Sequence, residues 1–236
     1  MTKRSPVVLV TGVSSGIGRA VADAFAAKGF EVFGTSRNPR TTQPVPGVEL
    51  VQLDVTDDAS VQAAAAAIEA GGGLDVLVNN AGIEERGDNN VVIGAADVTA
   101  DLMRHTFETN VFGTVRVTHA FLPLLRRSAA PVVVNVSSGL ASLTEVTTPG
   151  TPRYAYPGVA YPASKTAVNM ITVQYAKAFP NMRINAVEPG FTKTDLNGNT
   201  GIQTVEQGAE IIVRMAQLGP DGPTGGYFDA DGPLPW

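Results

Sequence analysis

Cysteine is absent from this 236-residue chain, and histidine occurs only twice, as His105 and His119. Without cysteine there can be no disulfide, zinc–thiolate site or cysteine nucleophile, and the composition fits a reducing compartment. The two histidines fall in one helical-looking stretch and do not have the spacing of metal ligands. We therefore expect no structural metal and a cytoplasmic location.

Basic clusters and long apolar runs are also missing. The net charge is −5 and the chain has no run of Lys or Arg, which argues against a surface that binds nucleic acid. No apolar run approaches the roughly 20 residues of a membrane span. Residues 7–10 are too short for the core of a signal peptide and lead directly into a glycine turn. A 44% hydrophobic chain of this length suits one domain, residues 1–236, with a sizeable core.

Apolar segments alternate with helical patterns along the chain. The expected strands are residues 7–10, 31–35, 48–53, 75–78, 131–136 and 183–187, with an edge strand at 226–228. The expected helices are residues 19–28, 59–70, 99–127 with a break near Asn110, 161–179 and 205–217. Strands that are apolar on both faces and alternate with helices form a parallel sheet covered on both sides. The sequence thus predicts an α/β fold with a doubly wound parallel sheet, the Rossmann fold.

The first expected strand leads into a glycine-rich turn, Gly12-x-x-x-Gly16-x-Gly18, and then into a helix. The beginning of a helix offers free N–H groups and a partial positive charge to a phosphate. Gly12 permits a tight turn, while Gly16 and Gly18 let backbone approach a pyrophosphate and let the helix pack on the strand. The spacing is not the general Gly-x-Gly-x-x-Gly fingerprint. The strand before it and the helix after it still favour dinucleotide binding over a plain structural turn.

Ligands of such sheets bind beyond the carboxyl ends of the strands, so the residues that follow each strand are the candidates. Turns at strand ends are also often polar without any role in binding. The cofactor-binding candidates are Gly12, Ser14, Ser15, Gly16, Ile17, Gly18, Ser36, Arg37, Asp54, Val55, Asn80, Ala81, Gly82, Pro189, Gly190, Thr192 and Thr194, with Tyr161 and Lys165 from the helix discussed below. Asp54 with Val55 is expected at an adenine edge, and the alternative for Asp54 is a helix cap near Asp57.

The residues after the second strand favour NADP over NAD. An NAD site carries an acid there that accepts the ribose 2′-hydroxyl. Residues 32–48 contain neither Asp nor Glu, and Ser36-Arg37 takes that place with Arg40 nearby. A guanidinium forms charge-assisted bonds to a 2′-phosphate, whereas a carboxylate would repel it. The alternative for Arg37 is a solvated loop charge.

A phenol and an ammonium four residues apart, Tyr161 and Lys165, share one face of an expected helix. The unperturbed pKa of tyrosine, near 10, is too high for acid–base work at neutral pH. A cation about 4 Å away would lower that pKa by roughly three units. The alternative is an ordinary pair on a helix surface. No other tyrosine of the chain has a lysine four residues later.

These motifs resemble the short-chain dehydrogenases/reductases in order and approximate spacing, over nearly the whole chain. The matching segments are Thr11-Gly-x-x-x-Gly-x-Gly18, Asn79-Asn-Ala-Gly82, Asn110, Ser138, Tyr161-x-x-x-Lys165 and Pro189-Gly190. Any one of these motifs can occur by chance in an unrelated protein, but the whole set in this order is specific to the family. Within the family, residues 220–236 look most like the ending of the carbonyl-reductase branch.

The resemblance implies roles for four residues. Ser138 would donate a hydrogen bond to the substrate oxygen and Tyr161 would transfer the proton. Lys165 would lower the pKa of Tyr161 and hold the nicotinamide-ribose hydroxyls, and Asn110 would anchor a water that relays protons to Lys165. Ser137 competes with Ser138, but neighbouring strand residues face opposite sides, and the family pattern selects the second. For Asn110 the alternative is a helix-interior Asn bonded to backbone.

The expected activity is therefore NADP(H)-dependent interconversion of a small to medium aldehyde or ketone and its alcohol by hydride transfer. One alternative is a 3-oxoacyl thioester reductase of the same family, which needs an approach for a long carrier arm. Another is a non-catalytic dinucleotide-sensing regulator, which would have no need of all four residues.

Two segments depart from the family pattern, and one helix bears on assembly. Residues 142–158 are longer than usual and either line the substrate pocket or cover a helix, while the short segment after Pro189-Gly190 implies a small lid. Residues 161–179 carry charge only at Lys165 and Lys177. Such a helix is normally buried on both sides. This predicts a homo-oligomer, a dimer in preference to a tetramer, unless residues 142–158 cover the helix in a monomer.

Overall fold

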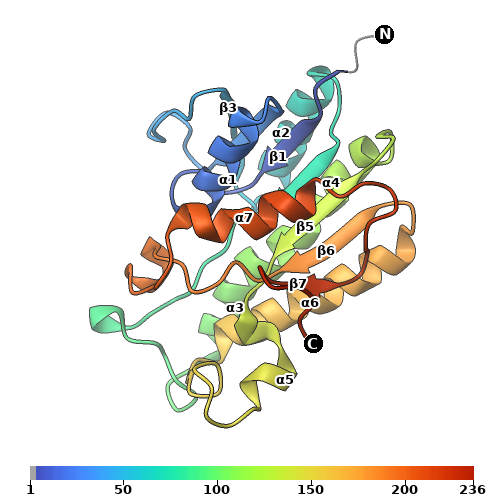
Figure 1. Ribbon diagram of the computed structural model, residues 1–236. Coiled ribbons are helices and arrows are strands. Elements are labelled where there is room, and N and C mark those ends of the chain that lie inside the picture. The colour runs from blue at the N-terminus through green and yellow to red at the C-terminus, as the bar shows by residue number, and fades with distance from the viewer. Residues whose placement is uncertain (1–3) are drawn as a thin grey trace.

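A seven-stranded parallel sheet forms the centre of the computed structural model, which describes residues 4–236 (Figure 1). The strand order is β3-β2-β1-β4-β5-β6-β7, so the direction of winding reverses between β1 and β4. The strands are β1 (Val7–Val10), β2 (Glu31–Ser36), β3 (Val48–Gln52), β4 (Val76–Asn79), β5 (Val132–Val136), β6 (Arg183–Val187) and β7 (Tyr227–Phe228). Ligands of open α/β sheets bind at such a reversal point, beyond the carboxyl ends of the strands.

Helices cover both faces of the sheet, as the two-sided apolar pattern predicts. Figure 1 shows α1 (Gly16–Ala27) and α7 (Val205–Ala216) on the near face, with α2 (Asp58–Ala70), α4 (Gly113–Leu125) and α6 (Ala160–Ala178) behind. The residues of β1 alternate between the two layers, because successive strand side chains point to opposite faces. Val8 and Val10 pack with the α1–α7 layer, and Val7 and Leu9 with the other. No helix within residues 4–236 is both long and apolar enough to cross a membrane.

The predicted fold class is confirmed, and every expected strand and helix is present within a few residues of its predicted bounds. α1 begins at Gly16, three residues before the expected start, because the glycine turn itself forms the first helical turn. The break expected near Asn110 is a π-helical turn, η2 (Glu108–Phe112), between α3 (Ala100–Phe107) and α4. A π-turn inserts one residue without ending the helix and often marks a functional position.

Residues 142–158, expected as an irregular loop, contain the one-turn helix α5 (Leu143–Val146). Ser142 begins this turn by accepting a hydrogen bond from the backbone N–H of Glu145 at 3.1 Å. We call residues 142–158 the long loop. Near its far end, Gly158 forms an isolated antiparallel bridge with Gly94, which ties the long loop to the segment after β4.

Candidate active site

A cleft of about 1780 Å³ opens along the carboxyl ends of the strands. This is larger than the roughly 300–1000 Å³ of an ordinary small-molecule pocket, so it has room for a dinucleotide and a substrate together. Every predicted cofactor-binding residue lines it, as do Ser138, Tyr161 and Lys165. Asn110 alone among the predicted site residues does not border this cleft.

The glycine turn has the shape that a phosphate site requires. Gly12 and Gly16 have positive φ angles of 73° and 60°, which L-residues with side chains rarely adopt. A Cβ on Gly18 would lie 2.2 Å from the carbonyl oxygen of Gly12, so only glycine lets α1 begin this close to the turn. Ser15 caps α1 without a side-chain hydrogen bond, and the first turn has no acidic residue. The start of α1 therefore presents its N–H groups and positive dipole to the cleft, which fits the pyrophosphate of a dinucleotide.

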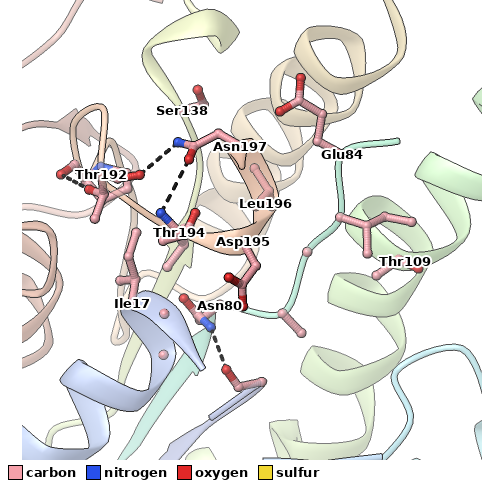
Figure 2. A pocket seen from close by; sticks show the side chains of 18 of the residues that line it. Ile17, Asn80, Glu84, Thr109, Ser138, Thr192, Thr194, Asp195, Leu196 and Asn197 are labelled. Carbon is pink, nitrogen blue, oxygen red and sulfur yellow. Dashed lines mark hydrogen bonds between the residues drawn. The ribbon is translucent and has the colours of Figure 1, made fainter. Parts of the chain in front are cut away.

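Asn80 fixes this turn from the neighbouring strand. Its side-chain amide donates to the carbonyl oxygens of Thr11 at 2.9 Å and Gly12 at 3.2 Å (Figure 2). The Thr11 hydroxyl in return accepts from the backbone N–H groups of Asn80 and Ala81. These reciprocal bonds join the ends of β1 and β4 at the reversal point of the sheet. Asn79 has a different role, because its amide donates to Asn135 and Thr118 inside the core.

One end of the cleft carries two guanidinium groups. Arg37 is exposed there, directly after β2, and Ser36 beside it accepts bonds from the N–H of Asn38 and the hydroxyl of Thr42. Arg19 lines the same cleft from the first turns of α1 and donates to the carbonyl oxygens of Gln43 and Pro44, both at 2.9 Å. Arg19 is not among the predicted site residues, although its place directly after the glycine turn was a usable signal.

Asp54 does not cap α2, so that alternative is wrong. Asp57 is the cap, since its carboxylate accepts from the N–H groups of Ala59 and Ser60. Asp54 lies in the cleft with Val55, and its carboxylate accepts from the N–H and hydroxyl of Thr56.

The segment after β6 closes over the glycine turn. Gly190, after Pro189, has a φ of 83°, and the segment then runs through the short helix η4 (Asp195–Asn197) to α7. Thr194 lies above α1, because a Cβ on Gly16 would be 3.3 Å from its methyl group. Thr192 is buried, and its hydroxyl bonds within the segment to Gly190 and Gln203. Thr194 thus faces the cleft while Thr192 holds the segment together (Figure 2).

The two serines after β5 face opposite sides, as strand alternation predicts. Ser137 is 1% exposed and donates to the amide oxygen of Asn169 at 2.6 Å, inside the protein. Ser138 lines the cleft, and its hydroxyl is near enough to Tyr161 to lower the pKa of the phenol. The buried hydroxyl of Tyr227 donates to the carbonyl oxygen of Ser138 and so fixes the position of this residue from the edge strand β7. Of the two serines, only Ser138 acts on the pKa of the phenol.

Lys165 and Tyr161 are neighbours, but Lys165 is not at the phenol oxygen. Its ammonium group lies over the ring, 5.7 Å from the ring centre, and donates to the carbonyl oxygen of Val136 at 2.8 Å. Burial lowers the pKa of Lys165 to about 8. Burial and the charge of Glu84 raise the pKa of Tyr161, against a lowering by the Ser138 hydrogen bond. The expected lowering by Lys165 is therefore wrong for this structure, because desolvation of the phenol dominates.

Asn110 lies in the π-turn, and its side chain is hydrogen-bonded to the backbone of Ile83. Its amide oxygen accepts from the N–H of Ile83 at 2.8 Å, and its amide nitrogen donates to the Ile83 carbonyl at 2.9 Å and to Ser164 at 3.0 Å. A Cβ on Gly82 would be 3.3 Å from this amide and 3.4 Å from the Lys165 ammonium. Asn110 therefore holds the segment after β4 against α6, close to Lys165. Its predicted water relay stays a prediction.

The long loop lines the substrate end of the cleft and contacts both of its walls. On one side, Tyr156 donates to the carboxylate of Glu84, which also pairs with Arg86 at 2.8 Å. On the other, Arg153 pairs with Glu145 at 2.9 Å and approaches Glu188 to 3.6 Å. Of the two alternatives weighed for this loop, the structure shows the first, a wall of the pocket.

Sequence reasoning missed these five pocket residues, Glu84, Arg86, Arg153, Tyr156 and Glu188. Glu84 lies two residues after the Asn79-Asn-Ala-Gly82 segment and Glu188 directly follows β6, so their positions after the strand ends were a usable signal. The two long-loop residues lie in a segment predicted either to line the pocket or to cover a helix, and local pattern did not decide between these because it does not fix the path of a loop. Burial raises the pKa of Glu188, while Arg153 and the N–H groups of Gly139 and Gly190 lower it.

Comparison with known proteins now identifies the family. The family profile described as short chain dehydrogenase matches residues 6–204. The chain belongs to the short-chain dehydrogenase/reductase family. It is 31% identical to a (+)-neomenthol dehydrogenase of Capsicum annuum, over 96% of both chains. It also resembles the crystal structure of NADPH-bound carbonyl reductase from chicken fatty liver, with a TM-score of 0.85, 27% identity and coverage of 99% of this chain and all of that one. A Burkholderia cenocepacia short-chain dehydrogenase in complex with NADP gives a TM-score of 0.79 and 27% identity over 95% of each chain.

Membership establishes the general activity. This protein is an oxidoreductase of the family, whose members use a nicotinamide dinucleotide to interconvert alcohols and carbonyl compounds. The resemblance to carbonyl-reductase-like members, inferred from the motifs, is confirmed at the level of the fold.

Proposed function

We propose that the protein is an NADP(H)-dependent carbonyl reductase that converts a small to medium aldehyde or ketone into its alcohol, with Tyr161 as the proton donor. The observation that carries this proposal is that Ser138 and Tyr161 both line the cleft that contains the glycine turn, with the Ser138 hydroxyl near enough to lower the pKa of the phenol. Two neighbouring hydroxyl groups can then both donate to a carbonyl oxygen.

The chain's own residues bind the carbonyl oxygen of the substrate and donate the proton to it. When bound, NADPH supplies the hydride. Ser138 and Tyr161 hold the carbonyl oxygen, and the negative charge that develops on this oxygen is stabilised by their hydrogen bonds. Since the pKa of Tyr161 is raised, the phenol is protonated at neutral pH and is ready to give up its proton. The buried Lys165 ammonium, held at Val136, adds positive charge beneath the ring.

Charge at the substrate end supports a neutral carbonyl compound over a thioester on a phosphorylated carrier arm. Four carboxylates line the part of the cleft formed by the segment after β4, the long loop and the residue after β6, against the two guanidinium groups of Arg86 and Arg153. The carboxylates are Glu84, Glu85, Glu145 and Glu188. An excess of negative charge in a cleft repels anionic substrates. Support for NADP comes from Arg37 and Arg19 at the other end, and from relatives described as binding NADPH or NADP.

Titration with NADPH followed by a carbonyl panel tests the proposal. We expect NADPH-dependent reduction of cyclohexanone and an aromatic aldehyde. The anionic 2-keto acids and 3-oxoacyl thioesters should give kcat/KM values at least about tenfold lower, because one repelled charge costs about 1.4 kcal/mol or more. A best rate on the thioester would select the alternative reductase. NADPH binding with no turnover on any carbonyl would select the dinucleotide sensor.

We also propose that the protein forms a homodimer through the outer face of α6 and the π-turn. Met170 on α6 is 59% exposed and Phe112 of η2 is 50% exposed, which leaves apolar surface on this side. The polar contacts of the long loop go elsewhere: to Glu84 and Glu188 in the cleft, to Gly94 on the segment after β4 and to Trp236 at the C-terminus.

Light scattering coupled to size exclusion should give a mass near twice the 24.5 kDa of one chain. Met170→Glu is expected to yield the single-chain mass with NADPH binding intact, since a charge in an apolar interface is costly. Leu143→Glu, at an equally exposed leucine of the long loop, serves as the control and should remain dimeric. A wild-type mass of one chain at micromolar concentration would contradict the dimer.

A further inference from the structure

Glu84 is a buried carboxylate for which the family mechanism has no use. It follows Gly82-Ile83 on the segment that leaves β4, and Figure 2 shows it on the continuation of the chain beyond Asn80. Its side chain is only 6% exposed, and the partner guanidinium of Arg86 is 14% exposed. The carboxylate accepts one hydrogen bond from Arg86 and another from the phenol of Tyr156. A charge buried this deeply acts over several ångströms with little screening.

The carboxylate lies beside the acid–base tyrosine. A small hollow next to the main cleft, between the segment after β4 and the start of α6, is bordered by Glu84, Tyr156 and Tyr161, with the more exposed Glu85 also on its edge. The other charged or titratable groups around Tyr161 are Arg86, Glu188 after β6, Tyr227 on β7 and Lys165 on α6 itself, with the Ser138 hydroxyl nearby. Among the neighbouring charges, that of Glu84 has the largest effect on the phenol, and it opposes ionisation.

We propose that Glu84 is a positioning residue of the proton-transfer step: held between Arg86 and Tyr156, its carboxylate keeps the Tyr161 phenol protonated until the substrate accepts the proton. This rests on the proposed function of Tyr161 as proton donor. The two members of the ion pair change the pKa of Tyr161 in opposite directions, because Arg86 favours the phenolate and Glu84 disfavours it. Tyr156 brings the long loop into the same arrangement, so the loop that walls the substrate end also fixes the carboxylate.

The test is a pH titration of Tyr161 itself, which requires no turnover. Protein labelled with ¹³C at the ζ carbon of tyrosine gives five signals, and Tyr161→Phe assigns the one of interest. The titration uses protein saturated with NADP⁺, because a positive nicotinamide lowers the pKa of a nearby phenol into the measurable range. Glu84→Gln should lower the midpoint of the Tyr161 titration by about one pH unit. This is the effect expected from removing a buried charge that its Arg86 partner partly offsets. Arg86→Met should move it in the opposite direction.

Two further variants separate charge from structure. Glu85→Gln removes an adjacent carboxylate that is 42% exposed and paired with His105, and it should leave the Tyr161 midpoint unchanged. Tyr156→Phe keeps the Glu84 charge, so it should not reproduce the fall seen in Glu84→Gln. Opposite shifts at Glu84 and Arg86 support the proposal, since a merely structural defect would not change sign.

A Tyr161 signal in Glu84→Gln that follows the wild type at every pH would overturn the role of Glu84. So would equal shifts in Glu84→Gln and Glu85→Gln. Failure of the proposed function is separate, because it would appear as missing NADP⁺ binding or missing turnover in the wild type.

Discussion

Tyr161→Phe should lower kcat for carbonyl reduction by about 10²-fold or more, the range expected for loss of a general acid. The substitution removes one hydroxyl and keeps the ring against the Lys165 ammonium, so the fold and the NADPH dissociation constant should be preserved. Steady-state rates at neutral pH, where the raised pKa keeps the phenol protonated, measure the loss. Direct titration with NADPH measures the dissociation constant, which should not change.

The matched control for this variant is Tyr154→Phe. Tyr154 lies on the long loop and is 53% exposed, so loss of its hydroxyl should leave kcat within a factor of about two. Near-native turnover in Tyr161→Phe would rule out the phenol as the proton donor. A parallel loss of NADPH binding would instead indicate damage to the cleft.

Most of the fold could be predicted because its strands and helices are encoded locally. Val7 to Val10 form a strand buried on both faces, and the glycine turn after them has the positive φ angles that its glycines predict. Parallel strands bring their carboxyl ends to one edge, so residues far apart in sequence were placed together without any knowledge of contacts. This is why nearly all predicted site residues line one cleft.

What the sequence did not predict depends on burial and on loop paths. The direction of the Tyr161 pKa shift was wrong because spacing places Lys165 near the ring but does not reveal how deeply the phenol is desolvated. Tyr156 and Arg153 reach Glu84 and Glu188 across the cleft, from a loop whose course no periodicity encodes. The side-chain bonds of Asn110 to Ile83 and Ser164 likewise follow from tertiary packing of the π-turn.

Arg37→Asp should raise the dissociation constant of NADPH by about 10²-fold and leave that of NADH unchanged or a few-fold lower. A charge-assisted hydrogen bond contributes roughly 1.5–3 kcal/mol, which corresponds to about 10- to 100-fold in affinity, and the new carboxylate adds repulsion of a 2′-phosphate. Arg37 suits this role because it is exposed at the cleft, directly after β2, and forms no ion pair within residues 4–236.

Arg40→Asp is the control that distinguishes a specific contact from the general field of the loop. Arg40 lies three residues further on, is exposed and does not line the cleft, so the same change in net charge there should alter NADPH affinity by only a few-fold. Both dissociation constants are measured by quenching or enhancement of nicotinamide fluorescence at fixed ionic strength, since any phosphate contact weakens in salt. If the wild type binds NADH more tightly than NADPH, or if Arg40→Asp matches Arg37→Asp, then Arg37 is a solvated loop charge and the 2′-phosphate site lies elsewhere, with Arg19 as the next residue to substitute.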